Sequence, residues 1–411
     1  MPRRPRWWLV GLCALIIVSA GLVAWSVVST DDDQTFDVDV PATDTGAVDP
    51  AGAALALQEF VRAIETDDGP RAAAVAGADP SSQSLAVAVV DNASAAHIRD
   101  VSLRYIDSLG TTDSAGVWDA AVAVEWRYAG FDVAPASTET VVRFESGEEG
   151  VRVVDLGGES LRSPLWLTSA LSVSRTEETL VLSAASELLD QYTRLSRRAV
   201  DTVARVLPEW DRRLVVEVPA DRVALEEALD VESGNYQQIA AVAGSADGTV
   251  TADSAVHVYV NPAVFGGLGK RGREVVLAHE AAHVAGDGPT SRAPTWLVEG
   301  FADYVALRDS PLPVTRTAAQ IRERVRSEGL PTALPSASDF DVQGPHLGSV
   351  YEAAWLACRV LAEHRDDSSF LNFYDAVSGG EALGSALRRI FDWSLDEFVV
   401  TWQNDLSSLL G

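Results

Sequence analysis

Residues 279–283 form the pattern His-Glu-Ala-Ala-His in a chain of 411 residues that contains only six histidines. Two histidines four positions apart lie on one face of an α-helix, about 6 Å apart along its axis, so both imidazoles can approach one metal ion. The surrounding residues 273–285 are nearly all apolar, which predicts a buried helix. Gly286 and the Asp-Gly-Pro sequence after it favour a reversal of the chain directly after this helix. The two histidines therefore constrain the fold. It must bury this helix and bring further ligand side chains to the end that carries His279 and His283.

A second helix is predicted to begin near Pro294 and to end before Pro311, with Glu299 and Asp303 one turn apart on it. Two histidines and a glutamate are a standard ligand set for catalytic zinc, which keeps its fourth position for water. We therefore predict one zinc ion per chain, bound by His279, His283 and Glu299. Glu280 lies beside this site and is the predicted general base. Asp303 is predicted to accept the second N–H of a ligating histidine.

Residues 279–283 and the Trp-Leu-Val-Glu-Gly-Phe-Ala-Asp-Tyr sequence of residues 296–304 together resemble the gluzincins. These are zinc peptidases in which HExxH is followed by a glutamate ligand on a second helix, and residues 296–304 are similar to the peptidase-MA-like branch. The resemblance covers about residues 165–411 and implies a zinc peptidase. Fifteen residues separate His283 from Glu299, fewer than in the best-known branches, which indicates a shortened connection.

Residues 344–355 lead into an apolar helix that resembles the tyrosine-bearing helix of this family. The resemblance implies that Tyr351 donates a hydrogen bond to the oxyanion of the transition state. The alternative is that Tyr351 only packs at the start of its helix. His346 is a second candidate for an oxyanion or substrate contact, against the alternative of a solvated loop histidine.

The strand expected at residues 256–260 carries no acidic residue, whereas aminopeptidase relatives have there a glutamate that holds the free amine of the substrate. Valines alternate along this strand, and as an edge strand beside the metal it would bind an extended peptide through backbone hydrogen bonds. We therefore expect cleavage within a peptide rather than removal of its first residue. His257, inside the strand, is expected to be structural.

Residues 7–28 are uncharged and mainly apolar, and they lie between Arg3, Arg4 and Arg6 on one side and the acidic run 31–33 on the other. This segment is long enough to cross a bilayer, and the flanking charges favour a cytoplasmic N-terminus. We expect residues 1–30 to be a cytoplasmic tip and transmembrane anchor in the lipid bilayer of the cell membrane, with the catalytic part outside the cytoplasm. The alternative is secretion after cleavage of a signal peptide. Residues 31–50 are predicted to be an acidic linker.

Residues 51–160 are predicted to form a small α+β domain, similar in element order to the cone-shaped domains of nuclear-transport-factor-like proteins, a likeness that implies no ligand. Its predicted helices lie within 51–77, and its strands at 98–107, 117–129, 137–145 and 150–156. Residues 163–411 are predicted to be the gluzincin-like domain, with a mainly helical C-terminal part. The expected fold class is thus α+β: a single N-terminal transmembrane helix, the small α+β domain and the peptidase domain.

The net charge of −28 repels phosphate backbones and argues against a nucleic-acid partner. The predicted function is hydrolysis of peptide bonds by a zinc-activated water, with a peptide or protein as substrate. One alternative is a catalytically silent zinc-containing scaffold, against which the intact Glu280 and ligand set stand. The other is a zinc hydrolase of a non-peptide amide or ester, which the same metal chemistry permits. The identity of the substrate and the oligomeric state stay open at this point.

Overall fold

The computed structural model describes residues 48–158, 160–341 and 344–409. Within these ranges no helix is both long and apolar enough to cross a membrane. The longest described helix, α12 (Leu347–His364), has 18 residues but carries Glu352, Arg359 and Glu363, and charges of this kind are expensive inside a bilayer. The predicted fold with a transmembrane helix is therefore wrong for the described part of the chain. The residues predicted to form that helix, 7–28, lie outside the described residues.

Three helices open the described chain and begin in the same way. They are α1 (Pro50–Glu65), α2 (Gly69–Val75) and α3 (Pro80–Ala96). Each has an aspartate N-cap that accepts a hydrogen bond from a backbone N–H of the first turn, and each has a proline at the first or second helical position. Both features favour helix initiation. The helix α3 was not among the predicted ones, because its many small residues give it a weak apolar periodicity.

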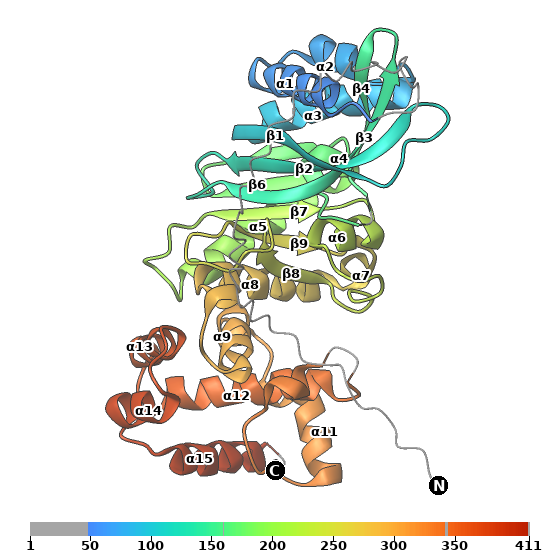
Figure 1. Ribbon diagram of the computed structural model, residues 1–411. Helices are drawn as coiled ribbons and strands as arrows, with labels where there is room; N and C mark the ends of the chain where they lie inside the picture. Colours follow the sequence, from blue (N-terminus) through green and yellow to red (C-terminus); the bar gives the residue numbers. More distant parts are fainter. Residues whose placement is uncertain (1–47, 159, 342–343, 410–411) are drawn as a thin grey trace, which may run out of the picture. The chain divides into compact units, whose positions relative to one another are not determined.

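The helices α1 to α3 pack on a four-stranded antiparallel sheet in the order β1-β2-β3-β4 (Figure 1). Its strands are β1 (Ile98–Leu109), β2 (Val117–Tyr128), β3 (Ala136–Gly147) and β4 (Gly150–Leu156). They overlap the four segments expected to be strands. The aromatic rings of Trp118 and Phe144 stack at 5.6 Å within the core between helices and sheet.

A second sheet of five strands follows, in the order β5-β6-β7-β9-β8. Its strands are β5 (Ser172–Arg175), β6 (Thr179–Ser183), β7 (Leu214–Val218), β8 (Ala241–Ser245) and β9 (Val256–Val260). The strand β9 pairs with β7 on one side and with β8 on the other. The expectation that residues 256–260 form an edge strand is therefore wrong. The edge strand is β8, because β9, which comes later in the chain, pairs between β7 and β8.

The second sheet is buried on both faces, and its side chains alternate between two cores. Val216 and Val258 point toward the helices α5 (Leu189–Ala204) and α8 (Lys270–Ala285). Leu182 and Val215 belong instead to the apolar core that also contains the strands β1 to β4. The core that contains Leu182 and Val215 thus includes residues of both predicted domains, 51–160 and 163–411.

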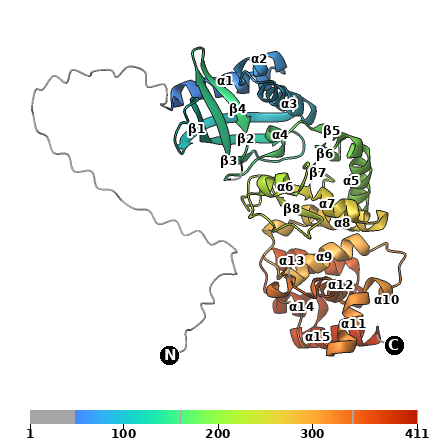
Figure 2. The same ribbon diagram turned by 90° about the vertical axis from the view of Figure 1, so that its right-hand side faces the viewer.

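Helices make up the rest of the chain after α8 (Figure 2). The shorter helices before it are α4 (Leu165–Thr168), η1 (Ser186–Leu188), α6 (Arg222–Leu229) and α7 (Pro262–Gly267). After it come η2 (Gly288–Thr290), α9 (Thr295–Leu307), α10 (Val314–Thr317), α11 (Ala319–Glu328), η3 (Ala337–Phe340), α12, α13 (Asp367–Ser378), α14 (Leu383–Phe391) and α15 (Leu395–Ser408). The helices α9 and α12 touch closely at Gly300, where an added Cβ would lie 2.5 Å from the carbonyl oxygen of Ala354. A glycine is therefore required at this crossing.

Candidate metal centre

Three side chains from two helices place their ligand atoms around one point. Nε2 of His279 lies 3.0 Å from Nε2 of His283 and 3.2 Å from Oε2 of Glu299. The third distance, from Nε2 of His283 to Oε2 of Glu299, is 3.4 Å. Donors about 2.1 Å from a tetrahedral zinc ion would lie about 3.4 Å from one another. The three residues predicted as ligands therefore fit a zinc ion in spacing and in chemical type.

The connection between the two helices brings Glu299 to the histidines. The helix α8 ends at Gly286, whose N–H donates to the carbonyl of Ala282, and Asp287 reverses the chain with a φ of 52°. The backbone then passes so close to His283 that a Cβ on Gly288 would lie 2.7 Å from Nδ1 of that histidine. A side chain at position 288 would collide with His283. The short connection between α8 and α9 therefore depends on a glycine at this position.

Asp303 lies one helical turn beyond Glu299 and contacts the ring nitrogen of His279 that faces away from the metal position. Its Oδ1 lies 2.9 Å from Nδ1 of His279. A hydrogen bond at Nδ1 leaves Nε2 as the atom that faces the metal position and fixes the orientation of the ring. The carboxylate of Asp303 therefore lies at the ring nitrogen of His279 that faces away from the metal position.

Glu280 lies beside the ligands and is only 8% exposed. Its Oε2 accepts a hydrogen bond of 2.8 Å from the backbone N–H of Ala243 in the edge strand β8. This bond fixes one carboxylate oxygen and so restricts the orientation of the whole carboxylate. No local sequence pattern indicates this contact.

Tyr351 is near the start of α12, and its ring centre lies 6.1 Å from that of His279. The ring of Phe340, in η3, packs edge-on against it at 5.2 Å. Tyr351 and Glu280 both line one cavity beside the metal position.

Burial and neighbouring charges shift the pKa values of the titratable side chains in this site. Burial raises the pKa of Glu280, and the charges of the two histidines oppose this rise. Burial also raises the pKa of Tyr351, with a further contribution from the charge of Glu299. Burial would raise the pKa of Glu299 as well, but hydrogen bonds from His279 and His283 outweigh it and bring this pKa well below its usual range.

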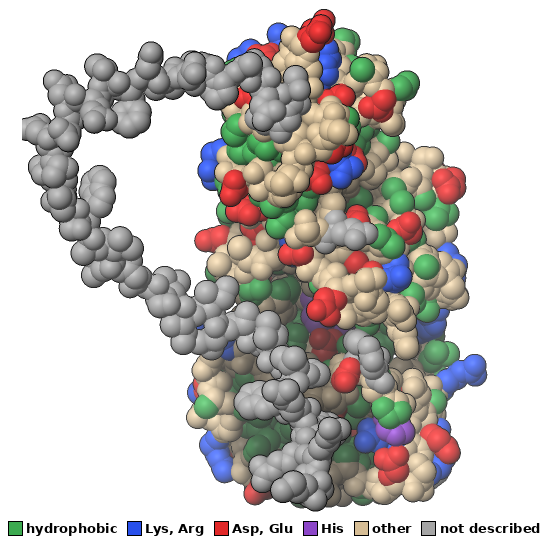
Figure 3. All heavy atoms as spheres, turned by 45° about the vertical axis from the view of Figure 1, so that its right-hand side comes forward, with side chains coloured by type: hydrophobic (Ala, Val, Ile, Leu, Met, Phe, Trp, Pro, Cys, Tyr) green, Lys and Arg blue, Asp and Glu red, His purple; other side chains and the backbone are tan. Residues whose placement is uncertain are grey.

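These groups lie at the base of a cavity of about 480 Å³ (Figure 3), where histidine and acidic side chains are visible in a hollow of the surface. The remaining lining residues are uncharged: Val231, Asn235, Tyr236, Ile239, Ala241, Val242, Ala243, Gly288, Pro289 and Val298. Most of them come from the segment around β8, which was not among the predicted site residues. Strand order decides which segment borders the metal, and no local sequence pattern encodes it.

His346 does not line this cavity. Its side chain is half exposed, and its Nε2 lies 3.7 Å from Oε1 of Glu328 in α11. His257 is fully buried and lies in β9. Neither histidine belongs to the group of ligand atoms around the metal position.

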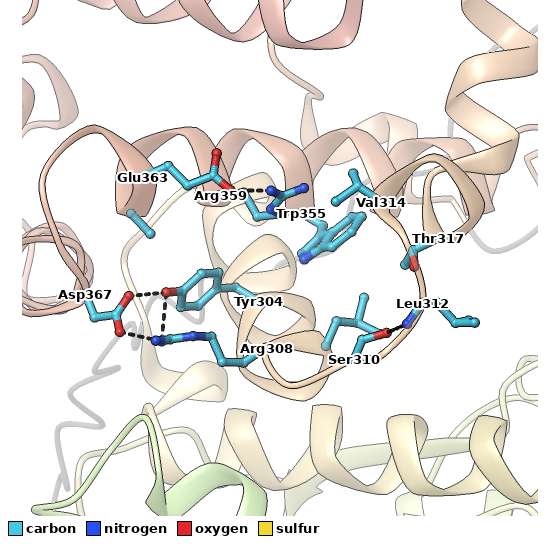
Figure 4. Close-up of a pocket in the computed structure, with 12 residues that line it drawn as sticks. Tyr304, Arg308, Ser310, Leu312, Val314, Thr317, Trp355, Arg359, Glu363 and Asp367 are labelled. Carbon is cyan, nitrogen blue, oxygen red and sulfur yellow. Dashed lines mark hydrogen bonds and ion pairs between the residues drawn. The ribbon is translucent and has the colours of Figure 1, made fainter. Parts of the chain in front are cut away.

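A second cavity, of about 340 Å³, lies at the far ends of α9 and α12 (Figure 4). The hydroxyl of Tyr304 donates to Asp367 at 2.5 Å, and Arg308 forms an ion pair with the same carboxylate at 2.5 Å. These bonds fix the C-terminal end of α9, the helix that carries Glu299 and Asp303.

Comparisons with known proteins give distant structural matches only. No protein-family model matches the chain, and no curated protein does. An M1 zinc metallopeptidase mutant from Deinococcus radiodurans matches at 14% identity and a TM-score of 0.33, over 74% of this chain and 61% of that one. The same mutant bound to a Tyr-Ser-Ala substrate gives 14% and 0.33, over 74% and 60%. A two-domain M1 zinc metallopeptidase mutant bound to L-arginine gives 13% and 0.34, over 75% and 61%.

The chain thus spans about three fifths of the length of these solved structures. Similarity at this level indicates neither the reaction nor the substrate of this chain.

Proposed function

We propose that this chain is a zinc metallopeptidase that cleaves peptide bonds within a polypeptide. The observation that carries the proposal is the convergence of His279, His283 and Glu299 within 4.8 Å of one another, with Glu280 and Tyr351 beside them in one cavity. When bound, zinc supplies a Lewis acid that lowers the pKa of a water molecule to about 7 and polarises a carbonyl group. An extracytoplasmic location, predicted from the charges that flank residues 7–28, is part of the proposal.

The chain's own residues divide the remaining work. His279 is oriented by the carboxylate of Asp303, at 2.9 Å. Glu280 takes a proton from the attacking water and later gives it to the leaving amine, because it lines the cavity beside the ligand residues while its Oε2 is held by the N–H of Ala243. Burial raises the pKa of this carboxyl group, which suits a base that must also act as an acid.

Tyr351 is proposed to donate a hydrogen bond from its hydroxyl group to the oxyanion that forms when the carbonyl is attacked. Its pKa is raised by burial, so the hydroxyl keeps its proton at neutral pH. A donor of this kind typically stabilises the transition state by about 3–4 kcal/mol. Phe340 restricts the movement of the ring and so keeps the donor in place.

Two features support cleavage within a polypeptide. The edge strand β8 borders the cavity and offers backbone groups to an extended peptide. Among the described lining residues, the only side chains that carry charge are those of the metal centre, Glu280 included. A free terminal amine or carboxylate of a substrate would therefore find no dedicated partner of opposite charge in this lining. The uncharged lining also favours uncharged side chains next to the cleaved bond.

The test compares the full chain with its Glu280→Gln variant, which keeps the size and most hydrogen bonds of the side chain. Zinc per chain and cleavage of a peptide library are measured for both. We expect one zinc per chain in both proteins and cleavage only in the unsubstituted one, at internal bonds. Blocking the peptide termini should leave the cleavage rate unchanged.

Other outcomes identify other functions. Bound zinc without peptide cleavage in the unsubstituted protein would favour a silent scaffold or a hydrolase of non-peptide amides or esters, and a panel of such substrates distinguishes the two. Equal cleavage by both proteins would remove Glu280 from the mechanism. An absence of zinc in both would refute the metal centre.

A further inference from the structure

His257 lies between two carboxylates in the interior of the protein. Its Nε2 lies 3.0 Å from Oδ1 of Asp132, and its Nδ1 lies 2.8 Å from Oε1 of Glu217. All three side chains are buried, with exposed fractions of 8% for Asp132, 3% for Glu217 and 0% for His257. We call these residues the buried triad. Removal of ionic groups from water is costly, and pairing with hydrogen bonds offsets this cost.

The buried triad joins two sheets. Asp132 belongs to the turn between β2 and β3, and its Oδ2 accepts a hydrogen bond of 2.7 Å from the N–H of Tyr128 at the end of β2. Glu217 and His257 belong to β7 and β9 of the second sheet. Both oxygens of Asp132 are thus engaged, one with each sheet.

Two residues of β8 connect His257 to the metal centre. His257 pairs with Gly244 of β8, and Ala243 directly precedes Gly244 in the same strand. The N–H of Ala243 donates to the carboxylate of Glu280 at 2.8 Å. A shift of β9 therefore moves β8 and the donor that fixes the proposed base.

The first sheet also holds the far end of β8. The N–H of Ser137, in β3, donates to Oδ2 of Asp247 at 3.0 Å, and Asp247 follows β8 by two residues. Asp247 in turn accepts a hydrogen bond from Ser245, the last residue of β8, at 2.8 Å. The edge strand is therefore tied to the first sheet through β9 and directly at its end.

We propose that the buried triad makes residues 48–156 a positioning part of the catalytic unit: it aligns β8, and through Ala243 it aligns Glu280. The activity readout of this inference rests on the proposed function. Asp132, His257 and Glu217 are positioning residues, because none of them lines the cavity of the metal centre.

The test uses the full chain with Asp132→Asn, which keeps the shape of the side chain and removes its charge. We expect zinc content to stay the same and kcat to fall by about 10- to 100-fold with little change in KM, since a small misplacement of a catalytic group has effects of this size. Deuterium uptake of peptides that cover 241–245 should rise, because the edge strand loses its anchor.

The matched control is Phe60→Leu, a substitution in the apolar core of α1 that does not touch the buried triad. It should lower the thermal stability of the same region without changing kcat or the exchange at 241–245. If Asp132→Asn fails to fold, Asp247→Ala removes the second tie, and the same readouts apply.

Equal kcat and equal exchange in the variant and in the control would overturn the inference. Failure of the proposed function would look different, because the unsubstituted protein would then cleave no peptide. The exchange at 241–245 would still test the positioning role in that case.

Discussion

Oδ1 of Asp303 lies 2.9 Å from Nδ1 of His279, and the two residues come from different helices, α9 and α8. The same helix α9 supplies the third ligand, Glu299, one turn earlier. One element thus provides both a ligand and the group that orients another ligand. The metal centre is for this reason sensitive to any movement of α9 relative to α8.

Asp303→Asn should lower the affinity for zinc by about 10- to 100-fold, because the amide holds the imidazole less firmly and makes Nε2 less basic. Titration with a chelator of known affinity measures the change. Asp309→Asn is the matched control, since Asp309 is exposed and pairs with Arg205. Equal affinities in both variants would contradict the assigned role of Asp303.

Tyr351→Phe should lower kcat by about 100-fold or more and leave zinc content unchanged, because one oxyanion donor is lost. Single-turnover kinetics with a cleavable peptide measures the effect. Tyr105→Phe is the control, because it removes another buried hydroxyl, in β1 and outside the metal centre. An unchanged kcat in Tyr351→Phe would reduce Tyr351 to a packing residue.

The positions of His279, His283 and Glu299 could be predicted because each depends on local helical spacing and on one short connection. The role of β8 could not be predicted in this way, because strand order depends on pairing between distant segments. His346 lies outside the cavity, in keeping with the alternative of a solvated loop histidine: its neighbour in space is Glu328, from an insert whose packing the local sequence does not specify.

The buried triad should make the free energy of unfolding depend on pH, with a loss of stability as the solution becomes alkaline. Burial opposes protonation of His257, but the charge of Asp132 and the hydrogen bonds of both carboxylates raise its pKa from 6.5 to about 10. A raised pKa in the folded state stabilises the protein fully below the unfolded value, so this contribution is present below about pH 6.5 and is lost as pH rises through 10.

Urea unfolding between pH 6 and pH 10 measures this dependence. The variant His257→Gln should be less stable at pH 6 and should lack the His257-dependent loss of stability toward pH 10. His346→Gln, which changes an exposed histidine, should retain that loss. A pH profile of His257→Gln parallel to that of the unsubstituted protein would show that His257 carries no extra proton in the fold.

Zinc should stabilise the folded chain, because the ligand atoms converge only after α8 and α9 have packed together. Removal by a chelator should lower the melting temperature, and zinc at about 1,000 times its Kd should restore about 4 kcal/mol. Calorimetry at several zinc concentrations measures this. The His283→Ala variant should show little response, and a full response in that variant would place the stabilising zinc elsewhere.

Gly300→Ala should force α9 and α12 apart, because the new Cβ would lie 2.5 Å from the carbonyl oxygen of Ala354 and 2.8 Å from Sγ of Cys358. Overpacking of this kind costs about 1–3 kcal/mol of folding free energy. The separation also moves Glu299 away from Tyr351, so peptide cleavage should fall more than the loss of folded protein explains.

Gly272→Ala is the opposite control. It lies within α8, and its Cβ would meet Leu268 at an ordinary 3.4 Å. Alanine should stabilise the helix by about 0.5–1 kcal/mol. Chemical unfolding and kcat of both variants measure these effects, and an unchanged stability of Gly300→Ala would mean that the two helices can separate without penalty.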